Sequence, residues 1–189
     1  MNRLTVFRKG GWDPAGFRYV YSPKCRSFPR FAQEDGCIVN RRGPNSDQYE
    51  YISILSGRKH ATGTALTTRC SFETYGAPLI VITDDVRRGP TGEFRFGVHW
   101  EIVAYEGGVN VWRLEPEKGD VRPECLARKK FPVSAGKIHR LTVRPEKGAL
   151  AVSLDGNAFS VAACVPAEFY AGVTACEGID RFFDFLEED

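Results

Sequence analysis

The sequence predicts an all-β fold in which short antiparallel strands form a sandwich or a barrel. Two observations carry this prediction. Apolar and polar residues alternate with a period of two in several segments, and 19 glycines and 11 prolines supply turn signals between them. A chain of 189 residues is also long enough to bury a sizeable core without metals or disulfides. We therefore expect residues 1–189 to form one β domain.

Eight segments have the alternation or the apolar character of strands. Their ranges are 49–56, 63–74, 77–85, 94–106, 109–114, 139–145, 149–156 and 169–176. Residues 1–30 lack regular alternation and are expected to pack as an irregular arm or an edge strand. The only helix-like segment is one turn at residues 166–170.

The segment HWEIVAYEGGVNVW, residues 99–112, predicts a hairpin around Gly107-Gly108. A two-residue loop at the two glycines would pair Tyr105 with Asn110 and Val103 with Trp112. Register matters here, because a slip of one residue exchanges the two faces of a strand.

Alternation along this hairpin assigns its side chains to two faces of a sheet. The apolar face is expected to lie in the core between two sheets and contains Trp100, Ile102, Ala104, Val109 and Val111. The opposite face is polar and aromatic and contains Arg95, His99, Glu101, Tyr105, Asn110 and Trp112.

A second hairpin is predicted within GKIHRLTVRPEKGALAVSLDGNAF, residues 136–159, with turns at 145–148 and at Asp155-Gly156. This segment resembles a hairpin of the concanavalin A-like lectin/glucanase superfamily and its laminin-G-like members. The matching positions are Gly136, His139, Leu141, Val143, Leu150, Val152, Asp155 and Gly156, whereas Ile138 stands where Trp is common. Residues 169–188 and 31–40 resemble the closing strands and an early strand of the same superfamily.

The resemblance implies a jelly roll of two curved antiparallel sheets, in which the concave sheet commonly carries a carbohydrate site. It does not select one function, since the superfamily includes lectins, carbohydrate-binding modules, glycoside hydrolases, lyases and protein-binding modules.

The polar and aromatic face suits a saccharide ligand. A sugar ring has apolar C–H faces and a rim of hydroxyls, so its site needs an aromatic platform and a few fixed polar groups. Trp112 and Tyr105 would supply the platform, and the polar side chains of the same face would bond the hydroxyls. Carbohydrate binding is therefore the leading hypothesis, against an ordinary half-exposed sheet face.

Two other function classes stay open. One glucanase family of the superfamily carries Glu-x-Asp-x-x-Glu, and EIVAYE places Glu101 and Glu106 at that spacing, with Val103 in place of the Asp. A glycoside hydrolase or lyase would use such carboxylates, although residues five apart on a regular strand face opposite sides. The third class is a protein-interaction scaffold or an oligomer subunit, so a homo-oligomer stays open too.

Asp84 and Asp85 are candidate calcium ligands, because hard cations prefer clustered oxygen atoms. A loop with solvated carboxylates is the simpler interpretation, and no other cofactor is expected. Six cysteines with irregular spacing, and no Cys-x-x-Cys pair, favour reduced thiols and no obligatory disulfide.

A formal net charge of +2 and the absence of a long basic run give no reason to expect nucleic acid or an anionic membrane as a partner. No apolar stretch approaches the roughly 20 residues of a membrane-spanning helix. The N-terminus has no apolar segment typical of a signal peptide, so we expect a cytoplasmic protein. A secreted chain with its signal removed is the alternative.

Overall fold

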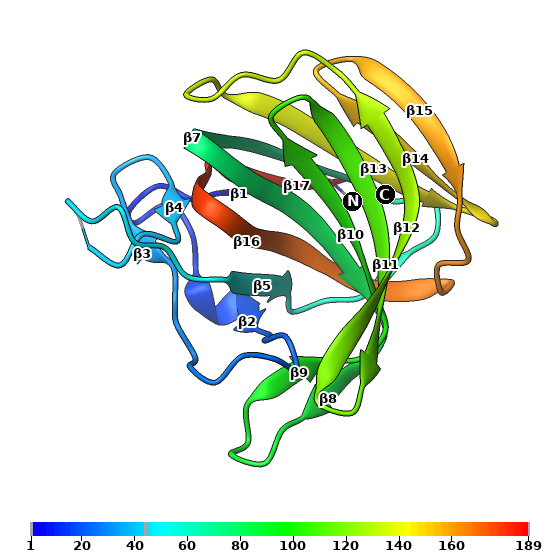
Figure 1. Ribbon diagram of the computed structural model, residues 1–189, viewed down its shortest axis with the longest axis horizontal. Coiled ribbons are helices and arrows are strands. Elements are labelled where there is room, and N and C mark those ends of the chain that lie inside the picture. Colours follow the sequence, from blue (N-terminus) through cyan, green and yellow to red (C-terminus); the bar gives the residue numbers. More distant parts are fainter. Residues whose placement is uncertain (1, 44, 189) are drawn as a thin grey trace.

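The computed structural model describes residues 2–43 and 45–188 and contains a sandwich of two antiparallel sheets (Figure 1). The first sheet has the order β2 (Phe17–Tyr19), β5 (Ile52–Ser56), β16 (Glu168–Phe182), β7 (Ala65–Thr83), β10 (His99–Tyr105), β11 (Gly108–Glu117) and β12 (Asp120–Lys130). The second sheet has the order β15 (Asn157–Ala162), β14 (Ala149–Leu154), β13 (His139–Glu146), β7, then the end of β16 followed by β17 (Asp184–Glu188), and β1 (Arg3–Val6).

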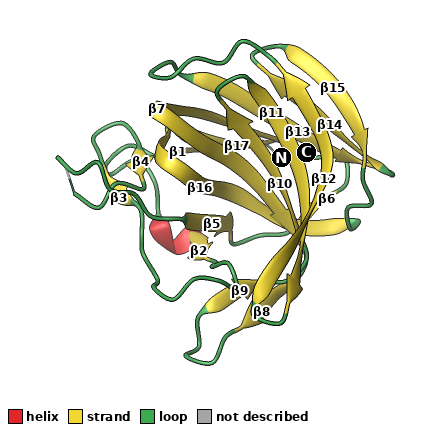
Figure 2. Cartoon of the chain, viewed as in Figure 1, coloured by secondary structure: helices red, strands yellow, loops and turns green. Residues whose placement is uncertain are grey.

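The smaller elements lie around this sandwich. β3 (Ala32–Gln33) and β4 (Ile38–Val39) pair beside the end of β16, and β6 (His60–Ala61) pairs with its start. β8 (Val86–Arg88) and β9 (Phe94–Phe96) form a separate ribbon, drawn at the lower end of Figure 2. The only helical element of the described residues is a single 3-10 turn, Pro14–Gly16, so none of their helices could cross a membrane.

Two long strands, β7 and β16, run through both sheets. Residues 77–83 of β7 belong to the first sheet and residues 65–72 to the second. The pairing of the two strands shifts register at Ala175, Gly178 and Asp180, which is where they pass from one sheet to the other. The sequence predicts two strands at 63–74 and 77–85, and the structure joins them into one.

The main hydrophobic core lies between the sheets and confirms the predicted inner face of the first hairpin. Trp100, Ile102, Ala104, Val109 and Val111 are all buried in it. They meet apolar side chains of the second sheet, among which are Leu141, Val143, Leu150, Val152 and Leu154. Full burial of each Val, Leu or Ile side chain among them contributes about 1.5–3 kcal/mol to folding.

The register predicted for the first hairpin is wrong by two residues. Tyr105 pairs with Gly108 and Val103 with Asn110, so the loop is Glu106-Gly107 and not Gly107-Gly108. Gly107 has a φ of 100°, a conformation that costs glycine little and other residues more. Because the error is an even number of residues, every side chain keeps its predicted face.

Three other predictions need correction. The segment 94–106 is not one strand, because it breaks at Gly97 and Val98 and its first part pairs with β8. Residues 166–170 do not form a helical turn, since β16 starts at Glu168. The sequence prediction also lacks β12, whose charged residues and internal Pro123 are typical of an edge strand.

The predicted second hairpin is confirmed, and its loop, Lys147-Gly148, lies within the predicted turn at 145–148. Glu146 pairs with Ala149, Leu141 with Leu154, and the Asp155-Gly156 turn follows. The Asp155 carboxylate accepts a hydrogen bond from the Arg140 N–H and lies 2.6 Å from Nδ1 of the buried His139. These two contacts hold the Asp155-Gly156 turn against the start of β13.

The residues 1–30 contribute edge strands to both sheets, with irregular chain between them. β1 pairs with β17 along Arg3–Val6, and β2 pairs with β5 along Phe17–Tyr19. All six cysteines are free thiols.

Gly172 lies where β5 and β16 approach most closely in the first sheet. A Cβ at this position would overlap the carbonyl oxygen of Ile54, which belongs to the backbone of β5. Gly36, in contrast, has open space around its Cα and an ordinary φ.

We expect Gly172→Ala to destabilise the protein by about 1–3 kcal/mol, because the backbone of a central strand must shift to admit the methyl group. Gly36→Ala is the matched control and should leave the free energy of unfolding, measured by urea denaturation, within about 0.5 kcal/mol of wild type. Equal stability of the two variants would contradict the close approach of β5 and β16.

Candidate functional site

A groove of about 530 Å³ lies on the outer face of the first sheet, over β10, β11 and β12. The predicted polar and aromatic face supplies Glu101, Tyr105, Asn110 and Trp112 to it. Val103 and Ala77 form its apolar floor. The structure therefore brings four of the six predicted ligand-binding residues together.

The aromatic side of the groove consists of Trp112 and Tyr105, both of which are half-buried. The Arg128 guanidinium lies 5.4 Å from the Trp112 ring centroid. A shift in the pairing of β11 with β12 between Val111 and Trp112 changes the pairing next to this ring. Trp112 thus stands on the groove side of the sheet, whereas Trp100 lies in the core.

Asn110 adds an incompletely used polar group. Its Oδ1 is buried and accepts no hydrogen bond within the described residues. Buried polar atoms are nearly always hydrogen-bonded in proteins, so this amide has capacity left for a ligand hydroxyl after a rotation of its side chain.

Glu101 is the buried carboxylate of the groove. It accepts a hydrogen bond of 2.7 Å from the Tyr51 hydroxyl. Tyr51 comes just before β5, which lies three strand spacings from β10 in the sheet. Burial raises the pKa of Tyr51 well above its usual value, and the Glu101 charge raises it further. Tyr51 therefore stays a hydrogen-bond donor to Glu101.

His99 lies behind Glu101 and does not line the groove. Its Nδ1 is 2.8 Å from the Gly97 carbonyl oxygen, so Nδ1 carries the proton and donates. Its Nε2 is 3.6 Å from Glu101 Oε1, and its ring stacks on Phe96 at 4.5 Å. His99 is therefore buried beside Glu101 and does not face a ligand.

Cys176 and Glu177 complete the groove from β16. Burial raises the pKa of the Cys176 thiol well above its usual value, and the Glu101 carboxylate adds to the effect. The thiol is therefore neutral, which does not suit a nucleophile. Glu177 is exposed at the groove wall.

Two predicted site residues lie elsewhere. Arg95 is in β9, beyond the break at Gly97, and it forms an ion pair of 2.5 Å with Glu93 and hydrogen bonds to the arm carbonyls of Pro23 and Cys25. Glu106 lies exposed in the hairpin loop and does not line the groove. The even pairing of β10 with β11 has no bulge that would turn Glu106 toward Glu101.

Asp84 is exposed, whereas Asp85 is engaged by neighbouring groups of the protein. Asp85 accepts hydrogen bonds from Arg87 Nε at 2.8 Å and from the Val98 N–H at 3.2 Å, which lowers its pKa. Within the described residues, no three His, Cys, Asp or Glu side chains lie close enough together to hold a metal ion.

Sequence reasoning missed Tyr51, Cys176 and Glu177. Tyr51 precedes β5, and Cys176 and Glu177 lie in β16, all far from β10 in sequence. Only the sheet order brings Tyr51 to Glu101 and the two β16 residues to the groove. Alternation along β16 does place Cys176 on the same face as Thr174. No local pattern, however, indicates that this face carries the groove.

No family model matches the chain, and a search of curated proteins finds no match. Solved structures do match. The carbohydrate binding module CBM66 from Bacillus subtilis is 16% identical, with a TM-score of 0.66 over 92% of this chain and 96% of that one. A Bacillus subtilis protein of unknown function with a galectin-like fold is 11% identical, with a TM-score of 0.68 over 98% and 94%. A glycoside hydrolase family 16 endo-glucanase from Bacteroides ovatus is 11% identical, with a TM-score of 0.63 over 97% and 98%.

At these identities the likeness shows the fold. The chain has the concanavalin A-like jelly-roll fold that the hairpin at residues 136–159 resembles.

Proposed function

We propose that this jelly-roll protein binds a carbohydrate, and that the saccharide lies in the groove over β10 and β11. The observation that carries the proposal is the combination of Trp112 and Tyr105 with Asn110 and Glu101 around one apolar floor. An apolar platform with a few polar groups complements the two kinds of surface that a sugar ring presents.

Two groups of the groove, Glu101 and Trp112, are held in place, which favours binding. Glu101 is fixed by the Tyr51 hydroxyl, and the Trp112 ring is packed against the second hydrophobic cluster, which includes Leu79 and Val81. A site that is ordered before the ligand arrives loses less conformational entropy on binding.

The solved structures support the same class of ligand. One is a carbohydrate binding module, and others are a κ-carrageenase in complex with an oligotetrasaccharide of κ-carrageenan and a β-agarase in complex with oligoagarose. Their sugars belong to those proteins, and the sugar of this chain is to be identified on a glycan array.

Trp112→Ala should weaken binding of the best array saccharide by about 1–3 kcal/mol, because it removes the stacking surface. Isothermal titration of wild type and variant measures the change.

Phe159→Ala is the matched control, since it removes an aromatic ring from β15 of the second sheet, which does not form the groove. It should keep wild-type affinity. Binding that survives Trp112→Ala, or that falls equally in both variants, would contradict the groove as the site.

A glycoside hydrolase or lyase is the second candidate, favoured by the buried position of Glu101 beside the Tyr51 hydroxyl in the groove. The paired use of Glu101 and Glu106 loses its support, because Glu106 lies in the loop. Hydrolases need two carboxyl groups at roughly 5–5.5 Å or 6.5–9.5 Å, and the other carboxylate of the groove is Glu177.

Glu101→Gln separates the two functions. A binding protein should keep its affinity within about 1 kcal/mol, because the amide oxygen still accepts the Tyr51 hydrogen bond. Reducing-end and unsaturated-product assays on the bound polysaccharide should show no turnover by wild type. Turnover that Glu101→Gln abolishes, with binding retained and with Glu106→Gln unaffected, would instead establish an enzyme.

A further inference from the structure

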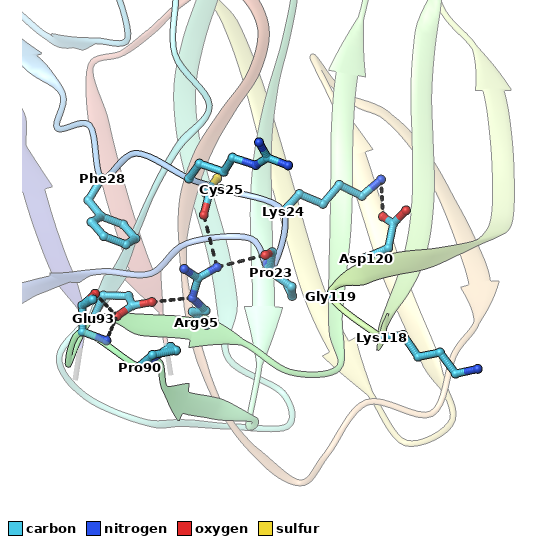
Figure 3. A pocket seen from close by; sticks show the side chains of 12 residues that line it. Pro23, Lys24, Cys25, Phe28, Pro90, Glu93, Arg95, Lys118, Gly119 and Asp120 are labelled. Atoms are coloured by element: carbon cyan, nitrogen blue, oxygen red, sulfur yellow. Dashed lines mark hydrogen bonds and ion pairs between the residues drawn. The ribbon is translucent and has the colours of Figure 1, made fainter.

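Two further hollows lie beside the groove, along the N-terminal arm. A hollow of about 620 Å³, shown in Figure 3, lies between the arm, the β8–β9 ribbon and the β11–β12 turn. It shares Lys24 with the groove over β10 and β11. It shares Phe28, Thr91 and Glu93 with the next hollow, of about 650 Å³. Each hollow thus shares lining residues with the next, and we call the three together the trough.

The arm part of the trough carries an excess of positive charge. Its two hollows are lined by six cationic side chains and two acidic ones, Glu93 and Asp120. Both acidic groups are already paired, Glu93 with Arg95 at 2.5 Å and Asp120 with Lys24 at 2.6 Å (Figure 3). The net charge of the whole chain is only +2, so the excess is a local feature.

Four cations remain for a ligand. These are Arg18, Arg26, Arg30 and Lys118, and none of them has a carboxylate partner in the described residues. Arg26 and Arg30 are exposed, whereas Arg18 is half-buried between the rings of Phe94 and Tyr170, at 5.2 and 5.0 Å.

Aromatic rings hold two of these guanidinium groups in place. Arg30 lies 5.2 Å from the Tyr19 ring centroid, and Arg18 lies between the Phe94 and Tyr170 rings. A guanidinium group that is held in place offers a fork that matches a carboxylate or a sulfate. The same contacts cover ring faces that nucleobases would need for stacking, which disfavours single-stranded nucleic acid as the ligand.

We propose that the saccharide is an anionic polysaccharide, with carboxylate or sulfate groups along its chain. Its sugar rings lie in the groove over β10 and β11, and the same chain extends past the Lys24–Asp120 ion pair to the arginines of the arm. This inference rests on the proposed function, since it extends the ligand of the same site. The groove supplies the ring contacts, and the arm supplies the selectivity for negative charge.

Two matched polymer pairs test the proposal by affinity electrophoresis of the whole chain. De-esterified and methyl-esterified homogalacturonan differ in carboxylate charge, and dextran sulfate and dextran differ in sulfate. We expect the anionic member of at least one pair to bind about tenfold more tightly at low salt, and the advantage to fall as salt is added. The pair that responds identifies the anionic group.

The double variant Arg26→Gln/Arg30→Gln should lose most of that advantage. Arg144→Gln/Lys147→Gln removes the same charge from exposed positions around the β13–β14 turn of the second sheet and should keep it. Equal losses in the two variants would show non-specific attraction and would overturn the proposal.

The remaining outcomes are also decisive. A single-stranded DNA oligonucleotide that displaces the polysaccharide at lower concentration, through the same two arginines, would overturn the proposal in favour of nucleic acid. Equal binding of charged and neutral polymers, or binding of none of the four, would overturn it as well. The proposal that the groove binds a saccharide would then still be tested separately, by the array saccharide and the Trp112→Ala comparison.

Discussion

The antiparallel pairing of β7 with β16 is the constraint on which the rest of the structure depends. Both strands pass from one sheet into the other, so their bend sets the distance and the angle between the two layers. The bend needs glycine on each strand, because a Cβ at Gly76 would overlap the Phe72 side chain and one at Gly178 would overlap the Tyr75 carbonyl. Asp180 accepts the Ala77 and Cys176 N–H groups there.

The polar contacts at this bend are buried, which makes them specific. Burial raises the pKa of Asp180 well above its usual value, and the two backbone N–H groups oppose that rise. The Asn40 side chain accepts the Asp180 N–H and donates to the Gly178 and Glu50 carbonyls. The bend therefore also orders the chain just before Tyr51, whose hydroxyl reaches Glu101. The bend that the sandwich requires therefore also helps to fix the Glu101 carboxylate of the groove.

Local patterns in the sequence predict the faces of β10 and β11 correctly, because alternation is a property of each strand alone. Such patterns fail where contacts between distant parts of the chain decide the structure. The break at Gly97 moves Arg95 onto a different ribbon, and the edge strand β12 carries too many charged residues to resemble a strand. The partners of Glu101 could not be predicted, since Tyr51 reaches it only through the order of four strands in the curved sheet.

The most direct test of the account is to observe which tryptophan meets the ligand. The chain has three, of which Trp112 faces the groove, Trp100 lies in the core and Trp12 packs on Phe7 and Phe17. A titration with the best array saccharide, followed by the indole N–H signals in ¹H–¹⁵N spectra, should shift Trp112 strongly and leave Trp12 in place, with at most a small change at Trp100. A saturating titration in which Trp112 stays fixed while binding is measured by calorimetry would contradict the account.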